Sequence, residues 1–148
     1  VHETHRTRPT FSTLMTEQLL AALPELKLNL DISHWMVVHE SLLEGRDALL
    51  EPIIDKTRHI HARIGYQEGP QVNDPNAPEW KAAVDRHLDI WEAIIKARWE
   101  AQQPITVTTE FGPPHYMPAL PYTQMPVSDQ WVANTYMMQR IKERLGLK

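Results

Sequence analysis

Three short apolar runs, each closing on a residue that can bind a metal, constrain the fold of this chain more than any other feature. They are residues 28–31, 59–61 and 105–110. Each run has the length of a short buried strand and is too short for an independent helix. Residues 2–5 look like the remaining end of a fourth strand. The residues at these strand ends are Glu3, Asp31, His61 and Glu110.

Segments with helical spacing separate these runs. The sequence predicts helices over residues 13–23, 47–56, 79–102 and about 128–145. Pro52 lies inside the second of them, which predicts a kink or two shorter pieces. Helices and strands alternate in the order αβαβαβα, so we expect an α/β fold with parallel strands and crossover helices. The carboxyl ends of such strands share one edge, where active-site groups gather.

Caps and apolar stripes refine the predicted helices. Thr10 or Ser12 is expected to cap the first helix and Ser128 the last. His87, on the apolar face of the third helix, is expected to be a core histidine with satisfied hydrogen bonds. The residues predicted to face inward are Met15, Leu19 and Ala22 in the first helix, Trp80, Val84, His87, Trp91, Ile94 and Ile95 in the third, and Val132, Met138, Ile141 and Leu145 in the last.

The four strand-end residues are spaced to form one site. They lie 28, 30 and 49 residues apart, and the first two intervals match one strand–helix unit of about 30 residues. Three carboxylates side by side would repel each other without a cation. Carboxylate oxygens with one imidazole nitrogen suit Mn²⁺, Mg²⁺, Co²⁺ or Zn²⁺, and the absence of thiolates argues against a purely structural zinc. The alternative is that each is an ordinary polar residue at the end of a strand.

Two further residues are candidates for binding a substrate. His34 follows Asp31 by three residues and could bond to a substrate oxygen or bind a second metal. Alternatively, it is a loop histidine packed by Trp35. Arg63 follows His61 by two residues, so both side chains share one face of the strand. Arg63 could bind a hydroxyl or phosphate group of a substrate, or form an internal ion pair.

Composition narrows the classes of partner. A chain of 148 residues with 42% hydrophobic residues suits one folded domain. The formal net charge is -4 and no basic block is present, which gives no support to a nucleic-acid partner. No apolar stretch approaches the about 20 residues that span a bilayer, so we expect no membrane partner. Cysteine is absent, which fits an intracellular protein, and we expect a cytoplasmic location.

The same residues resemble a known superfamily. Glu3, residues 31–34, residues 59–61 and Glu110 are similar to the C-terminal half of a xylose isomerase-like TIM barrel, the superfamily of sugar-phosphate isomerases and epimerases. The resemblance implies that residues 1–148 form one partial (β/α)₈ domain, from the end of strand five through helix eight. It also implies that Glu3, Asp31, His61 and Glu110 bind a divalent metal, with Glu3 and Glu110 as the catalytic acid and base.

The implied activity is isomerisation or epimerisation of a sugar or sugar phosphate by proton transfer through a metal-stabilised enediolate. His34 and Arg63 would bind the substrate. The superfamily's epimerases often carry an arginine six residues after the metal histidine, where this chain has Gln67, so the choice of sugar stays open. Two alternatives also stay open: a non-catalytic sugar-binding or scaffold relative, and a metal-dependent dehydratase or lyase.

Half a barrel has open sheet edges. A (β/α)₈ barrel needs about 200–250 residues or more, and this chain supplies about half of them. We therefore expect a missing N-terminal half, carried by a longer form of the chain, or pairing with a partner chain in a homo-oligomer. Glu3 is expected to be the weakest ligand, since the sequence predicts no strand before it to hold it, and the site is expected to be incomplete for that reason.

Overall fold

Four short strands form one parallel sheet, which the sequence predicted. The computed structural model describes residues 1–148, except for the side chain of Leu49. The strands are β1 (His2–Glu3), β2 (Leu28–Leu30), β3 (Thr57–Ala62) and β4 (Thr106–Thr109). Their order in the sheet is β1-β2-β3-β4, so consecutive strands are neighbours, and every pair is parallel. The predicted α/β class with parallel strands and alternating helices is confirmed.

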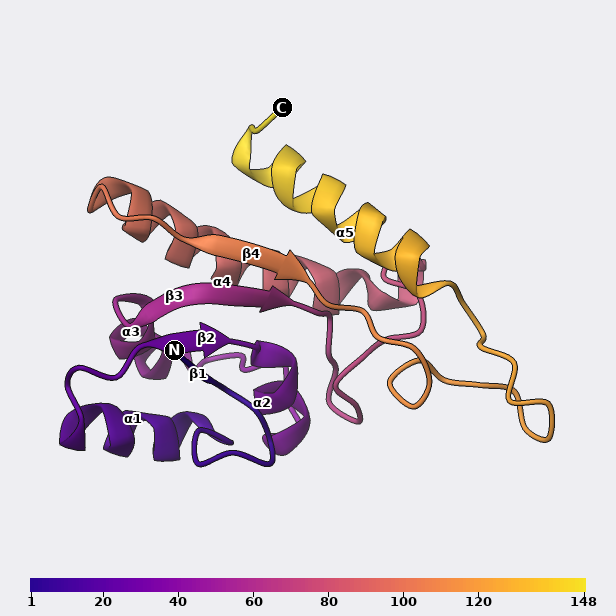
Figure 1. Ribbon diagram of the computed structural model, residues 1–148, viewed down its shortest axis with the longest axis horizontal. Helices are drawn as coiled ribbons and strands as arrows, with labels where there is room; N and C mark the ends of the chain where they lie inside the picture. The colour runs from indigo at the N-terminus through magenta and orange to yellow at the C-terminus, as the bar shows by residue number, and fades with distance from the viewer.

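The helices lie between the strands along the chain and form a continuous layer. α1 contacts α3, α3 contacts α4, and α4 contacts α5. α1 lies at the β1 edge of the sheet and α5 at the β4 edge, with α3 and α4 between them (Figure 1). The helices are α1 (Thr13–Ala22), α2 (Ile32–Val38), α3 (Asp47–Ile54), the 3-10 turn η1 (Pro78–Trp80), α4 (Lys81–Glu100) and α5 (Gln130–Leu145).

The two faces of the sheet differ in chemistry. Leu28, Leu30, Ile60 and Ala62 are fully buried in the apolar core. Because side chains alternate along a strand, the residues between them point to the other face. That face is polar, since it carries Glu3, Asn29, His59, His61, Thr106 and Thr108, which are joined by side-chain hydrogen bonds from Asn29 to His61 and from His59 to Thr106.

Helix starts follow the predicted capping chemistry in part. Ser12 caps α1, because its hydroxyl accepts a bond from the backbone N–H of Met15. Asp129, and not Ser128, caps α5 by accepting from the backbone N–H groups of Trp131 and Val132. α3 is shorter than predicted and is a single helix that contains Pro52, so of the two predicted alternatives the division into two pieces does not occur. α2 was not predicted as a helix, and Asp31 caps it.

The inward faces of α1 and α5 also differ from the prediction. In α1 the buried residues are Thr13, Thr16 and Leu20, and the hydroxyl of Thr16 can be buried because it donates to the Ser12 carbonyl. In α5 the buried side of the helix is set by Asn134, whose amide bonds to the backbone N–H and C=O of Phe111. A hydrophobic pattern treats such polar anchors as outward-facing. The residues buried in α5 are Ala133, Asn134, Met137 and Ile141, whereas Val132 and Met138 are exposed.

The predicted inward face is confirmed within α4, and so is the structural role of His87, whereas Trp80 belongs to η1 and is only partly buried. Val84, His87, Trp91, Ile94 and Ile95 are all buried. The Nδ1 of His87 donates to the Ala83 carbonyl at 2.8 Å, and its Nε2 accepts from the Gly65 backbone N–H at 3.2 Å. Gly65 is required here, because a Cβ would lie 2.7 Å from the Cα of Ser33. His87 therefore joins α4 to the segment that leaves β3.

Burial of His87 predicts a loss of stability in acid. Burial lowers the pKa of His87 from 6.5 to about 4, so the folded protein keeps the ring neutral while the unfolded chain takes up a proton below pH 6.5. The free energy of unfolding should therefore fall as the pH drops from 6.5 to about 4. At about 1.4 kcal/mol per pKa unit, the full effect is roughly 3 kcal/mol.

Urea titrations of the wild type and of His87→Gln across this pH range measure that effect. The variant is expected to lose less stability in acid than the wild type. Its remaining loss belongs to other groups such as His34, whose pKa burial also lowers to about 4. Parallel pH profiles for the two proteins would contradict the assignment to His87.

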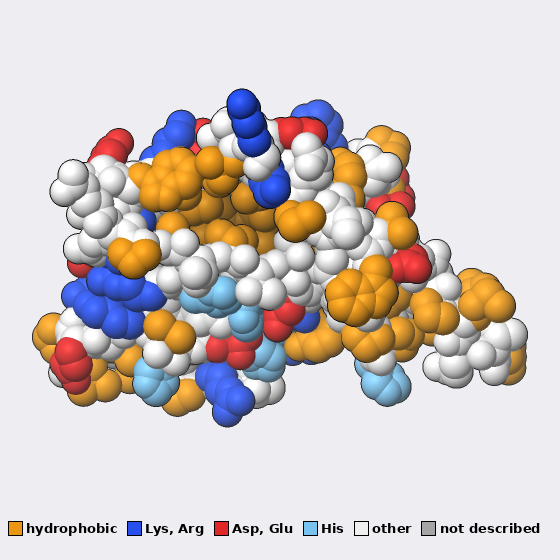
Figure 2. All heavy atoms as spheres, turned by 45° about the horizontal axis from the view of Figure 1, so that its top comes forward, with side chains coloured by type: hydrophobic (Ala, Val, Ile, Leu, Met, Phe, Trp, Pro, Cys, Tyr) orange, Lys and Arg blue, Asp and Glu red, His pale blue; other side chains and the backbone are white. Residues whose placement is uncertain are grey.

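An apolar hollow of about 510 Å³ lies between β4, α4 and α5 (Figure 2). It is lined by Ile95, Trp99, Ile105, Val107, Met138, Ile141, Leu145 and Leu147, among others. β4 is an outer strand, and Val107 and Trp99 are 36% and 45% exposed beside the hollow. In the described part of the chain, none of the helices combines the length and the apolar character needed to cross a membrane.

Candidate metal centre

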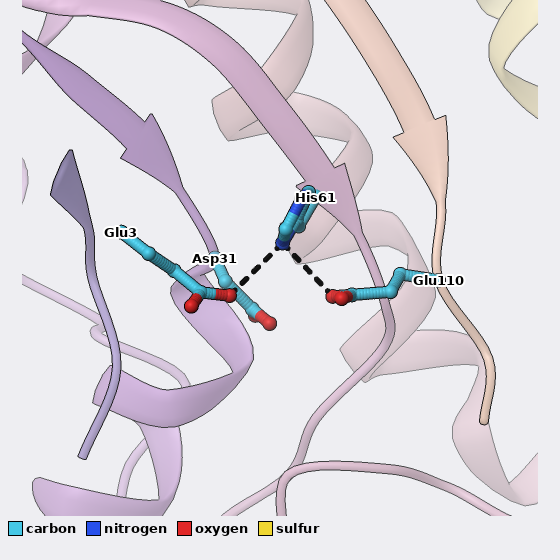
Figure 3. Close-up of side chains that lie close together, drawn as sticks. All are labelled: Glu3, Asp31, His61 and Glu110. Carbon is cyan, nitrogen blue, oxygen red and sulfur yellow. Dashed lines mark hydrogen bonds and ion pairs between the residues drawn. The ribbon is translucent and has the colours of Figure 1, made fainter. Parts of the chain in front are cut away.

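The sheet brings the four predicted ligands together at the carboxyl ends of its strands. Glu3 ends β1, Asp31 follows β2, His61 lies near the end of β3, and Glu110 follows β4. Each offers one ligand atom, and these atoms lie within 4.8 Å of one another. Glu3 and Glu110 point toward His61 from opposite sides, with Asp31 beside them (Figure 3).

β1 holds Glu3 in place, so the expectation that no strand supports this residue is wrong. His2 pairs with Leu28 and Glu3 with Asn29 in a parallel ladder. The backbone N–H of Thr4 then donates to the Asn29 carbonyl at 3.0 Å. Thr10 adds a hydroxyl bond to the carbonyl oxygen of Glu3. A two-residue strand is too short to recognise by periodicity, yet its backbone bonds fix the direction of the Glu3 side chain.

Asp31 is the most constrained of the four. Its side chain is fully buried and caps α2 by accepting from the Ser33 backbone N–H at 3.0 Å. The Thr4 hydroxyl bonds to both the N–H and the C=O of Asp31. These bonds occupy Oδ1 and the backbone. Oδ2 is thus the oxygen that Asp31 presents to the site. This oxygen lies 2.7 Å from Nη2 of Arg63.

His61 lies between the two glutamates. Its Nδ1 is 3.0 Å from Glu3 Oε1 and 3.0 Å from Glu110 Oε2. Burial opposes the charged form of His61, but the hydrogen bond and charge of Glu110 and the hydrogen bond of Glu3 outweigh it, so the pKa of His61 is raised above 6.5. A proton on Nδ1 is therefore held by the same atoms that would surround a cation.

Arg63 supplies a permanent positive charge at the edge of this cluster. Its Nη2 donates to Asp31 Oδ2 at 2.7 Å and to Glu110 Oε2 at 2.9 Å. Burial opposes its charge, but the charge and hydrogen bond of Asp31 outweigh burial and raise the pKa of Arg63. Its guanidinium lies 4.2 Å from the centre of the Tyr116 ring. The internal ion pair is thus present, while a role in substrate binding stays a prediction.

His34 lies beside the site with its ring fully buried. Its Nε2 is 3.6 Å from Asp31 Oδ2, and neither ring nitrogen has a hydrogen-bond partner. The ring lies against that of His5, with centroids 3.8 Å apart and the planes tilted by 55°, and the Tyr116 ring is 6.3 Å away. Burial lowers the pKa of His34 to about 4, so the ring is neutral and can donate or accept one bond. Binding of a substrate oxygen by His34 stays a prediction.

The donor set fits a divalent cation. Metal–oxygen and metal–nitrogen bonds of about 2.1 Å separate ligands across an ion by about 4.2 Å. The spread of 4.8 Å therefore needs to shrink by less than about 1 Å, which rotation of the half-exposed Glu3 and Glu110 side chains can supply. These four residues can hold a metal ion.

The sequence reasoning missed three polar residues that support the ligands. Thr4 and Ser33 bond to Asp31, and Asn29 bonds to His61. Asn29 could have been found, because it stands two residues before Asp31 and so shares its face of the strand. The hydroxyl contacts of Thr4 depend on the pairing of β1 with β2, which the sequence does not display.

Comparison of the chain with protein-family models, with curated proteins and with solved structures finds no match. The resemblance to xylose isomerase-like barrels therefore stays a prediction that depends on the site residues themselves. The fold and the site define a protein with a parallel α/β sheet whose strand ends converge on one acidic and imidazole cluster.

Proposed function

We propose that this cluster binds a divalent metal ion and that the protein is an isomerase or epimerase of a sugar or sugar phosphate. One observation carries the proposal most: Glu3 and Glu110 come from the two outer strands and approach His61 from opposite sides. Two carboxylates that face each other across a substrate can remove a proton from one face of a carbon and return it to the other. That is the proton transfer an epimerisation requires.

The other residues have defined roles in this proposal. Asp31 and His61 complete the ligand set, and their buried supports hold them before substrate arrives. His34 and Arg63 would bind substrate oxygens at the buried side of the site. When bound, a divalent ion at this site would polarise the substrate carbonyl and its neighbouring hydroxyl, which makes the carbon-bound proton more acidic. Mn²⁺, Mg²⁺, Co²⁺ and Zn²⁺ all fit oxygen and imidazole donors.

The proposed architecture is the C-terminal half of a (β/α)₈ barrel. Support comes from the consecutive order of four parallel strands and from the layer of helices that contact one another in sequence order. The polar face of the sheet would line the barrel interior. The outer strands β1 and β4 each have one neighbour, so a further set of strands is needed for closure. A longer form of the chain or a second copy in a homo-oligomer would supply it.

Metal binding is the first test of this function. The metal-stripped protein titrated with Mn²⁺ in a calorimeter should bind one ion per site, and Asp31→Ala should abolish that binding. Affinity should decrease as the pH falls through the raised pKa of His61, because the ion must displace a proton from Nδ1. The same preparation, incubated in D₂O with ketopentoses, ketohexoses and their phosphates, should exchange the carbon-bound hydrogen next to the carbonyl.

The contacts of Arg63 favour a second candidate, a sugar-binding or scaffold protein that needs no metal. Its guanidinium already neutralises part of the charge of Asp31 and Glu110. In that case Mn²⁺ would not bind at micromolar concentration, and exchange in D₂O would be absent. The two experiments above therefore separate the two candidates.

A further inference from the structure

Asn29 contacts His61 on the side of the ring that faces away from the carboxylates. Its amide nitrogen lies 2.9 Å from Nε2 of His61. The amide oxygen is buried and has no hydrogen-bond partner. Asn29 itself is only 7% exposed, so water has little access to this side of the ring. The amide is thus the hydrogen-bond partner that the structure gives to Nε2.

The two ring nitrogens of His61 have opposite requirements with and without a metal. In the observed arrangement the amide donates to Nε2, which leaves the ring proton on Nδ1, between Glu3 and Glu110. A metal ligand must instead present a lone pair. If Nδ1 binds the ion, the proton has to reside on Nε2, and Nε2 then needs an acceptor. In that state an amide N–H directed at Nε2–H would place two donors against each other, which is repulsive.

An amide can serve both states, because half a turn about its terminal bond exchanges donor and acceptor. The turn breaks no other bond of the amide oxygen, since that oxygen has no partner. We propose that Asn29 is a positioning residue that sets which nitrogen of His61 carries the proton: it donates to Nε2 when the cluster is metal-free and the ring is neutral, and it accepts from Nε2–H when Nδ1 binds the metal. The second half of this inference rests on the proposed metal site.

Two variants at this position separate tautomer control from simple packing. Asn29→Asp can only accept, so it matches the metal-bound state. Asn29→Leu has a similar volume and can do neither. We expect Asn29→Leu to bind Mn²⁺ about 10–100-fold more weakly than the wild type, and Asn29→Asp to bind at least as tightly as the wild type. The exposed Asn76→Leu serves as the matched control and should leave the affinity unchanged.

Long-range ¹H–¹⁵N spectra of the metal-free proteins provide a readout that needs no metal. At a pH where the wild-type ring of His61 is neutral, its Nε2 should be unprotonated and its Nδ1 protonated. In Asn29→Asp, at the same pH, Nε2 should carry a proton. A His61→Asn variant assigns the signals. Loading the wild type with Mg²⁺ should move the proton from Nδ1 to Nε2.

The outcomes of these experiments separate the proposed metal-dependent function from the proposed role of Asn29. Absence of Mn²⁺ binding in the wild type would overturn the proposed function, and the metal-free spectra would still decide whether Asn29 controls the ring. Equal weakening of Mn²⁺ binding by the Leu and Asp variants would reduce Asn29 to a packing role and overturn the inference. So would the same protonation of Nε2 in the wild type and in Asn29→Asp.

Discussion

Replacement of Arg63 by methionine is expected to lower the free energy of unfolding of the metal-free protein by about 3–5 kcal/mol. Arg63 is 3% exposed and its guanidinium bonds to Asp31, which is fully buried. Methionine keeps much of the length of the side chain but removes its charge. Asp31 would then keep its buried charge with only the Ser33 bonds to compensate it. A buried charge without its partner destabilises far more than the intact ion pair stabilises.

Mn²⁺ should restore much of this loss. The guanidinium and a bound cation would share the oxygens of Asp31 and Glu110, so an ion can take over the role of the missing charge. At 100 times its dissociation constant, a ligand specific for the folded state stabilises it by about 2.7 kcal/mol. Urea titrations of the wild type and Arg63→Met, each with EDTA and with Mn²⁺, measure both effects.

Arg144→Met is the matched control for this experiment. Arg144 also bridges two carboxylates, those of Asp89 and Glu92, but it does so at the exposed surface between α4 and α5. Exposed ion pairs contribute little to stability, so this variant should unfold close to the wild type in EDTA and gain the same stabilisation from Mn²⁺ as the wild type. If Arg63→Met in EDTA were as stable as Arg144→Met, the guanidinium would not be compensating the buried charge of Asp31.

The candidate site could be predicted from the sequence because parallel strands repeat one geometry. Asp31, His61 and Glu110 each close an apolar run, and the regular α/β rhythm places such residues at one edge of the sheet. Chain order and alternation were sufficient for that inference. The strand of Glu3 was only recognisable as a fragment, because two residues have no periodicity and their pairing with β2 is a long-range event.

The hydrogen-bond partners of individual side chains were harder to predict than the positions of these side chains in the fold. Alternation places Arg63 on the same face as His61, but it does not say that one guanidinium nitrogen reaches both Asp31 and Glu110. The same limit explains the error in α5. Hydrophobicity places Asn134 outside, whereas its two bonds to Phe111 turn that side of the helix inward. Polar residues that satisfy backbone groups override the apolar pattern, and they can be identified only once the tertiary neighbours are known.

Glu110→Gln and Glu3→Gln are each expected to reduce hydrogen–deuterium exchange at the substrate carbon by about 10²–10⁴-fold. Glutamine keeps the shape and one carbonyl oxygen of the side chain but can no longer accept a proton. If the two glutamates act on opposite faces of the substrate carbon, each variant should lose exchange more strongly for one of the two epimers at that carbon than for the other. A single-base isomerase would instead lose activity through one glutamate only.

Loss of metal and loss of the base have to be separated in these variants. Both side chains belong to the ligand cluster, so exchange is measured at Mn²⁺ concentrations that saturate each variant, with occupancy verified by calorimetry. Glu79→Gln, an exposed glutamate in η1, is the matched control and should exchange at the wild-type rate. If Glu110→Gln with full metal occupancy retained wild-type exchange, the opposed carboxylates would not be the acid and base, and Glu3 and Glu110 would be ligands alone.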